Sequence, residues 1–384
     1  MGRLDRNISV EDFRQLARRR LPKSVFEFVD GGAGQELTLL DNRAGFERIR
    51  LLPRVLTDVS RPDLTTTLWS KTYPTPLVIS PMGSCALVRP GADIAIATAA
   101  AARGIPYTLS TMATTGIGRM ARAVQGPLWF QLYVLKDFDF NRRLVRQAEE
   151  FGYSALVVTV DLQTGGKREK DLRNGISIPL RPSPRHLIEG IAHPGWSLRL
   201  LRDGFPQFEN VRGYLGDTGA GLTIAARVGR NLHAGFDWND LRTIRDWWKG
   251  PLIVKGVLHP GDAAGLIAEG ADGIWVSNHG GRQLDGAVSS IDAITTVRDA
   301  VGGRVPILID SGIRTGMDVI KAKARGAAAA AIGRAALFGA VEGRAGVERV
   351  LDVLLDEIAT GLKLCGLPSF QQVGSDLISP ALAG

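Results

Sequence analysis

Residues 273–283 read GIWVSNHGGRQ, an apolar run that changes abruptly into a polar, glycine-rich one. The apolar half predicts a buried parallel strand, because strands covered on both faces are apolar throughout rather than alternating. The polar half places His279, a titratable base, and Arg282, a fixed cation, on the loop that follows. Such a loop can bind a carboxylate and take a proton from the carbon beside it.

Short apolar runs of the same kind recur along the chain, with helical stretches such as 92–103 and 140–151 between them. Strands that alternate with helices pair in parallel, and eight of them predict a closed (β/α)8 TIM barrel of the α/β class. A doubly wound open sheet is the alternative. Besides 273–277, the expected strands are 77–80, 107–110, 128–133, 155–161, 252–255, 307–310 and 329–333.

We expect the chain to form a single domain over 1–384. Three segments of it lack the alternation of strands and helices. Residues 1–75 are expected to form an N-terminal helical cap, whose first helix is capped near Ser9 and ends before Pro22. Residues 76–350 form the barrel, with an Arg-, Pro- and Gly-rich insertion at about 175–231, after the fourth strand. Residues 351–384 are expected to be a helical tail.

Composition excludes several classes of protein. Only Cys85 and Cys365 are present, without metal-ligand spacing, which argues against a disulfide framework and a metal site. The charged N-terminus is no secretory signal, and no apolar run is long enough to span a membrane. A net charge of +8 suits anionic partners or merely an Arg-rich solvated surface, and no basic run interleaved with aromatics predicts nucleic-acid binding.

Polar residues and glycine end nearly every expected strand, where a TIM barrel places its chemistry. Together they predict one site at the carboxyl end of the barrel. These strand-end residues are Ser80, Ser110, Gln131, Tyr133, Thr159, Asp161, Lys255, Ser277, His279, Asp310 and Gly333.

Two strand-end loops predict a phosphate site. Asp310, Gly312 and Arg314 follow the seventh strand, and Gly333 and Arg334 follow the eighth. Glycine lets backbone N–H groups approach phosphate oxygens, and arginine adds charge-assisted hydrogen bonds. The alternative is an ordinary pair of helix starts with surface arginines.

The remaining charged residues at the strand ends suggest acid–base chemistry. Asp161 beside His279 would stabilise an imidazolium, and Arg168 with Arg282 could clamp a carboxylate. Lys255 ends an apolar run. It could form a Schiff base, stabilise an anion on a cofactor, or make a structural ion pair.

Four motifs carry a resemblance to a known family: 277–285 (SNHGGRQLD), 129–133 (WFQLY), 254–256 (VKG) and 310–314 (DSGIR). From Leu21 to the C-terminal tail, the chain resembles the FMN-dependent L-2-hydroxy acid dehydrogenases and oxidases. This family includes bacterial L-lactate dehydrogenase, which the chain resembles most, glycolate oxidase and (S)-mandelate dehydrogenase.

The resemblance implies a role for each candidate. His279 would be the base, Asp161 would stabilise its imidazolium, and Tyr133 would hydrogen-bond near the substrate hydroxyl. Arg282 and Arg168 would bind the substrate carboxylate. The residues implied for FMN, with Lys255 at the flavin edge, are Met82, Gly83, Ser110, Gln131, Thr159, Lys255, Ser277, Asp310, Gly312, Arg314, Gly333 and Arg334.

Phe28 departs from the family pattern, which has a tyrosine there that helps to hold the substrate carboxylate. A lost hydrogen bond to a charged group costs about 1.5–3 kcal/mol. We therefore expect either weaker binding of small hydroxy acids or a shift to larger, more apolar ones.

The resemblance also suggests partners. Gly83 stands where the family's dehydrogenases often have glycine and its oxidases alanine, which favours a quinone or cytochrome as electron acceptor. The 175–231 insertion mixes Arg with Leu, Ile and Trp, and is expected to contact a membrane or to form a solvated lid. We expect a homotetramer that is cytoplasmic or peripheral on the inner face of the cell membrane.

The resemblance implies oxidation of L-lactate to the 2-oxo acid, with a mandelate-type dehydrogenase or an oxidase of larger hydroxy acids as close rivals. A Schiff-base lyase that uses Lys255 and an FMN-retaining binding protein are the rivals from other classes.

Overall fold

The computed structural model describes residues 4–175, 183–204, 206–214 and 229–380. Its centre is a closed barrel of eight parallel strands in the order β10-β3-β4-β5-β6-β7-β8-β9. The prediction of a (β/α)8 barrel is therefore confirmed, and the open sheet is excluded. The strands are β3 (Leu77–Met82), β4 (Tyr107–Ser110), β5 (Leu128–Tyr133), β6 (Ala155–Thr159), β7 (Leu252–Val257), β8 (Gly273–Val276), β9 (Ile307–Ile309) and β10 (Ala329–Ile332).

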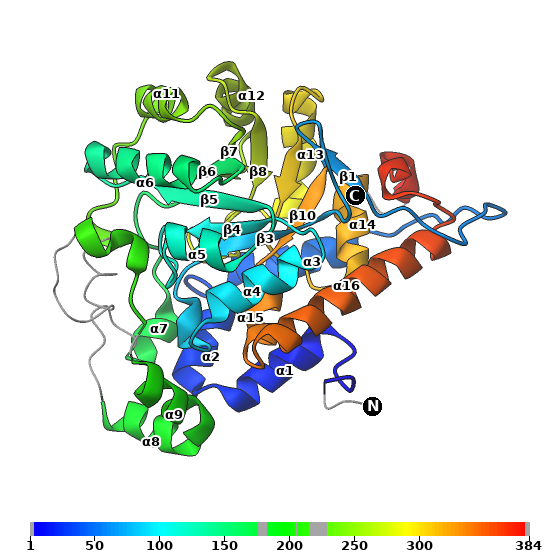
Figure 1. The fold of residues 1–384 in the computed structure, drawn as a ribbon. Helices are drawn as coiled ribbons and strands as arrows, with labels where there is room; N and C mark the ends of the chain where they lie inside the picture. Colours follow the sequence, from blue (N-terminus) through cyan, green and yellow to red (C-terminus); the bar gives the residue numbers. More distant parts are fainter. Residues whose placement is uncertain (1–3, 176–182, 205, 215–228, 381–384) are drawn as a thin grey trace.

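Helices surround the barrel, as right-handed crossovers between parallel strands require (Figure 1). Several begin at a side-chain cap, as α14 does at Thr315, whose hydroxyl accepts from the backbone N–H of Asp318. The helices that follow the strands are α4 (Ala92–Ala101), α5 (Ile117–Ala123), α6 (Phe138–Glu150), α11 (Trp238–Trp247), α12 (Pro260–Ala268), α13 (Ser290–Val301), α14 (Gly316–Ala324), α15 (Arg334–Ala340) and α16 (Arg344–Leu364).

Three helices form most of the cap: α1 (Val10–Arg20), α2 (Lys23–Asp30) and α3 (Leu37–Arg48). Ser9 is the N-cap of α1 and forms a capping box with Asp12, so the predicted start of this helix is confirmed. The helix ends before Pro22, also as predicted. The bidentate pair between Arg14 and Asp30 joins α1 to α2.

A hairpin that the sequence pattern did not predict closes the amino end of the barrel. It pairs β1 (Thr66–Leu68) with β2 (Lys71–Tyr73). Leu68 is 1% exposed and belongs to the same cluster as Trp129 and Trp275 inside the barrel. Trp69 packs edge-on against Trp129, with ring centroids 5.5 Å apart, so this end of the barrel is sealed by apolar groups.

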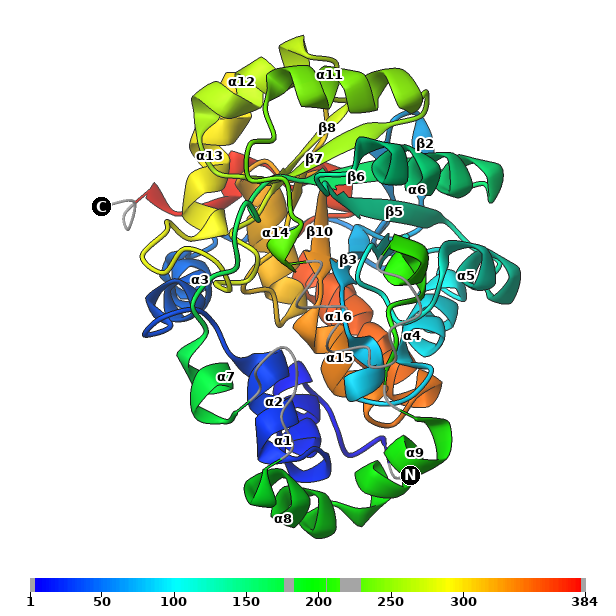
Figure 2. The same ribbon diagram turned by 90° about the vertical axis from the view of Figure 1, so that its left-hand side faces the viewer.

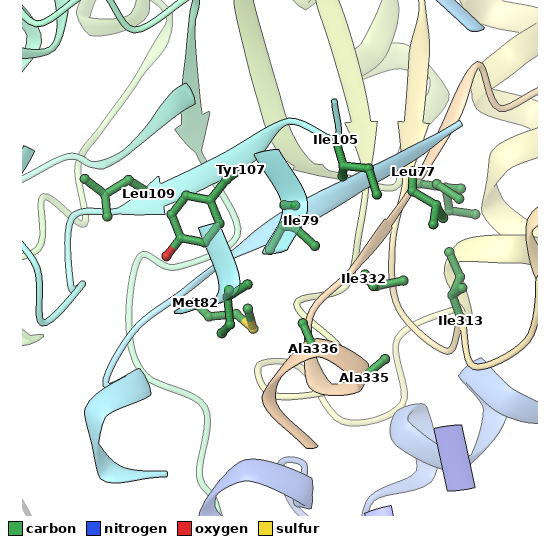
Figure 3. Packing of buried hydrophobic residues seen from close by; sticks show 14 of the residues in the cluster. Leu77, Ile79, Met82, Ile105, Tyr107, Leu109, Ile313, Ile332, Ala335 and Ala336 are labelled. Carbon is green, nitrogen blue, oxygen red and sulfur yellow. The ribbon is translucent and has the colours of Figure 1, made fainter. Parts of the chain in front are cut away.

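The core has two layers, because successive side chains of a strand point to opposite sides. Val78 points into the barrel interior, whereas its neighbours Leu77 and Ile79 belong to the outer cluster between strands and helices. Figure 3 shows this outer layer, where β3 and Ile332 lie next to Ala335 and Ala336 of α15.

Between β6 and α11 the chain leaves the barrel. The described elements there are α7 (Glu169–Arg173), α8 (Pro184–Ala192), α9 (Pro194–Asp203) and the 3-10 helix η2 (Glu209–Tyr214), and 176–182, 205 and 215–228 of the expected insertion lie outside the described residues. Helices α8 and α9 lie beside α1 and α2, far from α11 and α12 (Figure 2).

Two short 3-10 helices lie near the end of the chain. These are η3 (Phe370–Gln372) and η4 (Ser375–Leu377), and a further one, η1 (Cys85–Leu87), follows β3. The boundary expected at residue 350 falls inside α16, which packs on α14 and α15. No helix among the described residues is long and apolar enough to cross a membrane.

Candidate active site

The carboxyl ends of the strands and the cap enclose a cavity of about 420 Å³. This size is in the range of small-molecule and cofactor sites. Six of the eleven strand-end residues line it, together with residues from α2 and the start of α7: Ser80, Tyr133, Lys255, His279, Asp310 and Gly333. The predicted site residues that line the cavity are Phe28, Met82, Gly83, Tyr133, Arg168, Lys255, His279, Arg282, Asp310, Gly312, Arg314, Gly333 and Arg334.

His279 lies between two polar partners. Its Nδ1 is 2.9 Å from Asp161 Oδ1, and its Nε2 is 3.2 Å from the Tyr133 hydroxyl. Burial alone would raise the pKa of Asp161, but the charges of His279 and Lys255 lower it below its ordinary value. Asp161 is therefore a carboxylate at neutral pH, and it fixes the His279 ring so that Nε2 faces Tyr133.

Tyr133 retains its proton at this position. Burial, followed by the charge of Asp161, raises the pKa of the phenol well above its ordinary value. The hydroxyl of Tyr133 therefore stays neutral at physiological pH, and it is available as a hydrogen-bond donor in the cavity.

Lys255 is almost completely buried at the end of β7. Its amine donates to Ser277 Oγ at 2.7 Å and pairs with Asp310 Oδ2 at 3.1 Å. The register of β7 shifts between Lys255 and Val257, and a bulge of this kind re-aims a side chain at a strand end. An ammonium held by a carboxylate has no free lone pair, so this contact favours electrostatic stabilisation over Schiff-base chemistry.

Two arginines converge on Phe28. The guanidinium carbons of Arg282 and Arg168 lie 5.2 Å and 5.3 Å from the centroid of its ring, within cation–π range. Arg282 donates to the carbonyls of Phe28 and Gly31, while Arg168 pairs with Asp171 at 3.2 Å. Burial, and then the charges of Arg168 and Arg334, depress the pKa of Arg282.

Arg334 of the predicted phosphate site lies beside Arg282, since both donate to the carbonyl of Gly31. Arg334 donates to the carbonyls of Val29, Gly280 and Gly31. Burial and the charge of Arg334 lower the pKa of Arg314 to about 9. Arginines stay protonated in proteins, so these shifts mark a cluster of buried positive charge that favours bound anions.

Two glycines of the predicted phosphate site also line the cavity. Gly312 has φ +96°, which favours glycine, and a Cβ there would lie 2.1 Å from the carbonyl oxygen of Asn42. Gly333 lies next to Met82 and Ser80. The missing side chain at Gly312 therefore makes room for the backbone of α3, whereas the surroundings of Gly333 leave only ordinary contacts for a Cβ.

Four further predicted site residues are buried and are not among those that line the cavity. Ser277 Oγ accepts from the backbone N–H of His279, and Ser110 Oγ donates to Gln131 Oε1. Gln131 Nε2 and Thr159 Oγ1 are buried and make no hydrogen bond within the described part of the chain. Buried polar groups are nearly always satisfied, so these two atoms are suited to a polar ligand at the barrel mouth.

Some cavity residues were not among the predicted site residues. Ser311 has a left-handed backbone, with φ +75°, and its hydroxyl joins Asp310 to the backbone of Gly280. Its position directly after Asp310, in a strand-end loop, could have indicated that it belongs to the site. Phe208, within the expected insertion, and Leu232, directly after it, also line the cavity, and no sequence pattern marks them.

Comparisons with known proteins agree along nearly the whole chain. A model of the FMN-dependent dehydrogenase family matches residues 17–380. L-lactate dehydrogenase of Ectopseudomonas mendocina (strain ymp) is 41% identical over 369 residues, which cover 96% of this chain and 97% of that protein.

Solved structures give the same result. The monotopic membrane protein (S)-mandelate dehydrogenase has a TM-score of 0.94 and 40% identity, covering 97% of this chain and 99% of that one. A soluble mutant of the membrane-associated (S)-mandelate dehydrogenase from Pseudomonas putida has a TM-score of 0.84 and 37% identity, with the same coverage.

Proposed function

The chain belongs to the FMN-dependent dehydrogenase family, and from that premise we propose that it oxidises L-lactate to the 2-oxo acid. The observation that supports this most directly is the grouping of His279, Asp161 and Tyr133 beside the buried cation Arg282. A base and a cation in one cavity fit a substrate whose carboxylate adjoins the carbon to be oxidised.

FMN is the cofactor of this family, and the residues present fit it. Arg314, Arg334 and Gly312 line the cavity and suit its phosphate, with Asp310 at the ribityl chain. Lys255 would lie against the flavin edge, and the buried polar atoms of Gln131 and Thr159 would meet the ring system. The other residues assigned to FMN are Met82, Gly83, Ser110, Ser277 and Gly333. When bound, FMN accepts the electrons that leave the substrate.

The protein's own groups would bind and deprotonate the substrate. Arg282, with Arg168, would hold the carboxylate in a charge-assisted contact. His279 Nε2 would take a proton from the α-carbon or the hydroxyl, and Asp161 would stabilise the resulting imidazolium at 2.9 Å. Tyr133 would hydrogen-bond to the substrate oxygen.

A mandelate-type dehydrogenase is the second candidate, favoured by Phe28. Its ring contacts both arginines and offers no hydroxyl to the carboxylate. Apolar residues Phe208 and Leu232 also line the cavity and would suit a larger side chain.

Gly83 supports a quinone or cytochrome as electron acceptor rather than oxygen. It lines the cavity, and a Cβ at this position would lie 3.0 Å from Met112 Cβ and 3.2 Å from the Met112 carbonyl oxygen. An alanine, as in the family's oxidases, would require Met112 to move.

An anaerobic absorbance spectrum tests the activity. We expect a flavin spectrum that L-lactate bleaches; bleaching by L-mandelate alone would select the second candidate, and readmitted air separates oxidase from dehydrogenase by the rate of recolouring. A protein that binds no FMN after reconstitution would contradict both candidates.

The exposed face of α8 and α9 supports a peripheral contact with an anionic membrane. Its large apolar side chains are all more than half exposed, and Arg185 and Arg202 lie on the same helices. Apolar residues flanked by arginines suit an interface with acidic lipid. The apolar residues are Leu187, Ile188, Ile191, Leu198 and Leu201.

Vesicle sedimentation tests this contact. Wild-type protein should sediment with vesicles of acidic phospholipid at low salt, and replacement of Leu187, Ile191, Leu198 and Leu201 by serine should abolish it. Wild-type protein that stays in the supernatant would contradict the membrane contact. A solvated lid would then be the remaining interpretation of the insertion. A homotetramer, also proposed, is tested by light scattering of the same sample.

A further inference from the structure

Two neighbouring residues of α3, Asn42 and Arg43, contact two different loops of the cavity. Asn42 bonds to the loop after β8, which carries His279. Arg43 bonds to the loop after β9, which carries Gly312 and Arg314. Helix α3 belongs to the cap and not to the barrel, so the cap reaches both loops through adjacent side chains.

Asn42 and Asn278 form a reciprocal amide pair. Asn42 Nδ2 donates to Asn278 Oδ1 at 2.8 Å, and Asn278 Nδ2 donates to Asn42 Oδ1 at 2.7 Å. The two residues are 1% and 5% exposed, so water cannot replace these bonds cheaply.

The same two side chains hold the rest of the loop. Asn278 Oδ1 also accepts from the backbone N–H of Gly281 at 3.0 Å, and Asn278 Nδ2 donates to the carbonyl of Val288 at 3.1 Å. Asn42 Oδ1 accepts from the backbone N–H of Ser290 at 3.3 Å. The pair therefore joins the start of the loop to its end at α13.

His279, which follows Asn278 directly, depends on such support. Its backbone has φ +58°, a left-handed conformation that non-glycine residues adopt at a cost. Its ring must also face Asp161 and Tyr133 at once. A loop that relaxes by one ångström would lose one of these two contacts.

Arg43 holds the second loop independently. Its Nη1 donates to the carbonyl of Gly312 at 3.1 Å and lies 4.0 Å from Asp318 at the start of α14. Gly312 itself lies against the backbone carbonyl of Asn42. The loop that would hold the FMN phosphate is thus placed against the same turn of α3.

We propose that Asn42 is a positioning residue for His279 and that Arg43 is a positioning residue for the Gly312 loop, each acting on its own loop. This inference rests on the proposed function. It adds a division of labour on α3: Asn42 controls the rate of proton transfer, and Arg43 controls retention of FMN.

A double-mutant cycle tests the first half. Asn42→Ala and Asn278→Ala should each lower kcat, at saturating FMN and substrate, by about 30- to 100-fold. Substrate KM should change by less than about threefold, because Arg282 and Arg168 are untouched. The double variant should lose about as much as either single variant, since both remove one shared contact. Losses that multiply in the double variant would overturn the pair as the cause.

Arg43→Met tests the second half. The Kd for FMN, measured by flavin fluorescence during titration of the apoprotein, should rise by about tenfold. The kcat at saturating FMN should fall less than about threefold. An unchanged Kd, or a kcat loss as large as that of Asn42→Ala, would overturn the separate roles.

Stability controls keep the test decisive. Thr66→Val removes a buried hydroxyl that donates to the carbonyl of Ala328 at the amino end of the barrel, and it should leave kcat unchanged. If Asn42→Ala does not fold, Asn42→Asp keeps the size and both acceptor contacts, and it should still lower kcat by about tenfold. A folded Asn42 variant with a lowered Tm and normal kcat would show a purely structural role.

The wild-type protein separates this inference from the proposed function. Wild type that oxidises no 2-hydroxy acid contradicts the proposed function before any variant is made. Wild type that turns over, with Asn42 variants of normal kcat, contradicts only the inference.

Discussion

At the amino end of the barrel, Leu68 and Trp69 of the hairpin pack on Trp129, whereas at the carboxyl end Lys255 and His279 line a cavity of about 420 Å³. The first end excludes water with apolar groups and gains stability from it. The second end keeps charged groups buried, which costs stability unless they are paired.

The charged end is held together by pairs. Lys255 is paired with Asp310, and His279 with Asp161. The difference between the ends indicates that stability and chemistry are assigned to opposite ends of one sheet. Substitutions at the carboxyl end should therefore lower kcat with little effect on stability, and substitutions at the amino end should lower stability with little effect on kcat.

The largest effect should follow loss of the base at the carboxyl end. His279→Gln should lower kcat by about 1,000-fold or more, because His279 is the group proposed to take the proton. The flavin spectrum and the Tm should stay near those of wild type. A kcat within tenfold of wild type would show that His279 is not the base and would break the comparison.

At the amino end, Leu68→Ala should lower the stability of the fold and leave kcat nearly unchanged. A fully buried leucine lost from the barrel interior should cost about 3 kcal/mol of unfolding free energy, measured by urea denaturation. The kcat of the folded protein should stay within twofold. Thr67→Ala, at the exposed neighbouring position, is the matched control and should cost little. A kcat that falls with Leu68→Ala would show that the two ends are coupled.

Phe28→Tyr sharpens the picture of the carboxyl end by adding one hydroxyl. The added hydrogen bond to the substrate carboxylate should raise kcat/KM for L-lactate by about tenfold or more, equivalent to about 1.5–3 kcal/mol. Phe28→Leu, which removes the ring that contacts Arg168 and Arg282, should lower it. No gain with tyrosine would show that the missing hydroxyl does not limit small substrates.

The smallest effect concerns pH. Because the folded-state pKa of Asp161 is lowered, its carboxylate stabilises the fold above the unfolded-state pKa of about 3.9. This contribution is lost as the pH falls through the folded-state pKa.

The difference in unfolding free energy between wild type and Asp161→Asn should therefore shrink as the pH falls from about 5.5 to about 3, because the carboxylate of the unfolded chain becomes protonated over this range. The difference caused by Leu68→Ala should not change with pH. Denaturation curves at both pH values check this, and a difference that grows toward low pH would contradict the assigned sign.

The eight strands were predictable because a buried parallel strand is a local apolar run. The hairpin was not predictable, since its turn places Trp69 and Ser70 at positive φ (48° and 63°) without the glycine or asparagine that usually marks such a turn. The cap helix at Ser9 was predictable from its capping residues alone.

In the site, the strand-end positions of Lys255, His279 and Asp310 could be predicted from the barrel rule. Their pairing could not, because Lys255 and Asp310 lie at the ends of different strands and meet only when the barrel closes. Phe208 enters the cavity from the insertion and Leu232 from directly after it, and the path of this stretch depends on packing rather than on periodicity.

The sequence by itself determined the barrel, the family and the residue types at the site, because apolar periodicity and short motifs are properties of neighbouring residues. Only the tertiary structure decided which groups pair: Asn42 meets Asn278 across 236 residues of chain, and Asp161 meets His279 across 118. The physical reason is that such contacts are chosen by how the barrel closes and how the cap packs on it, which no local stretch encodes.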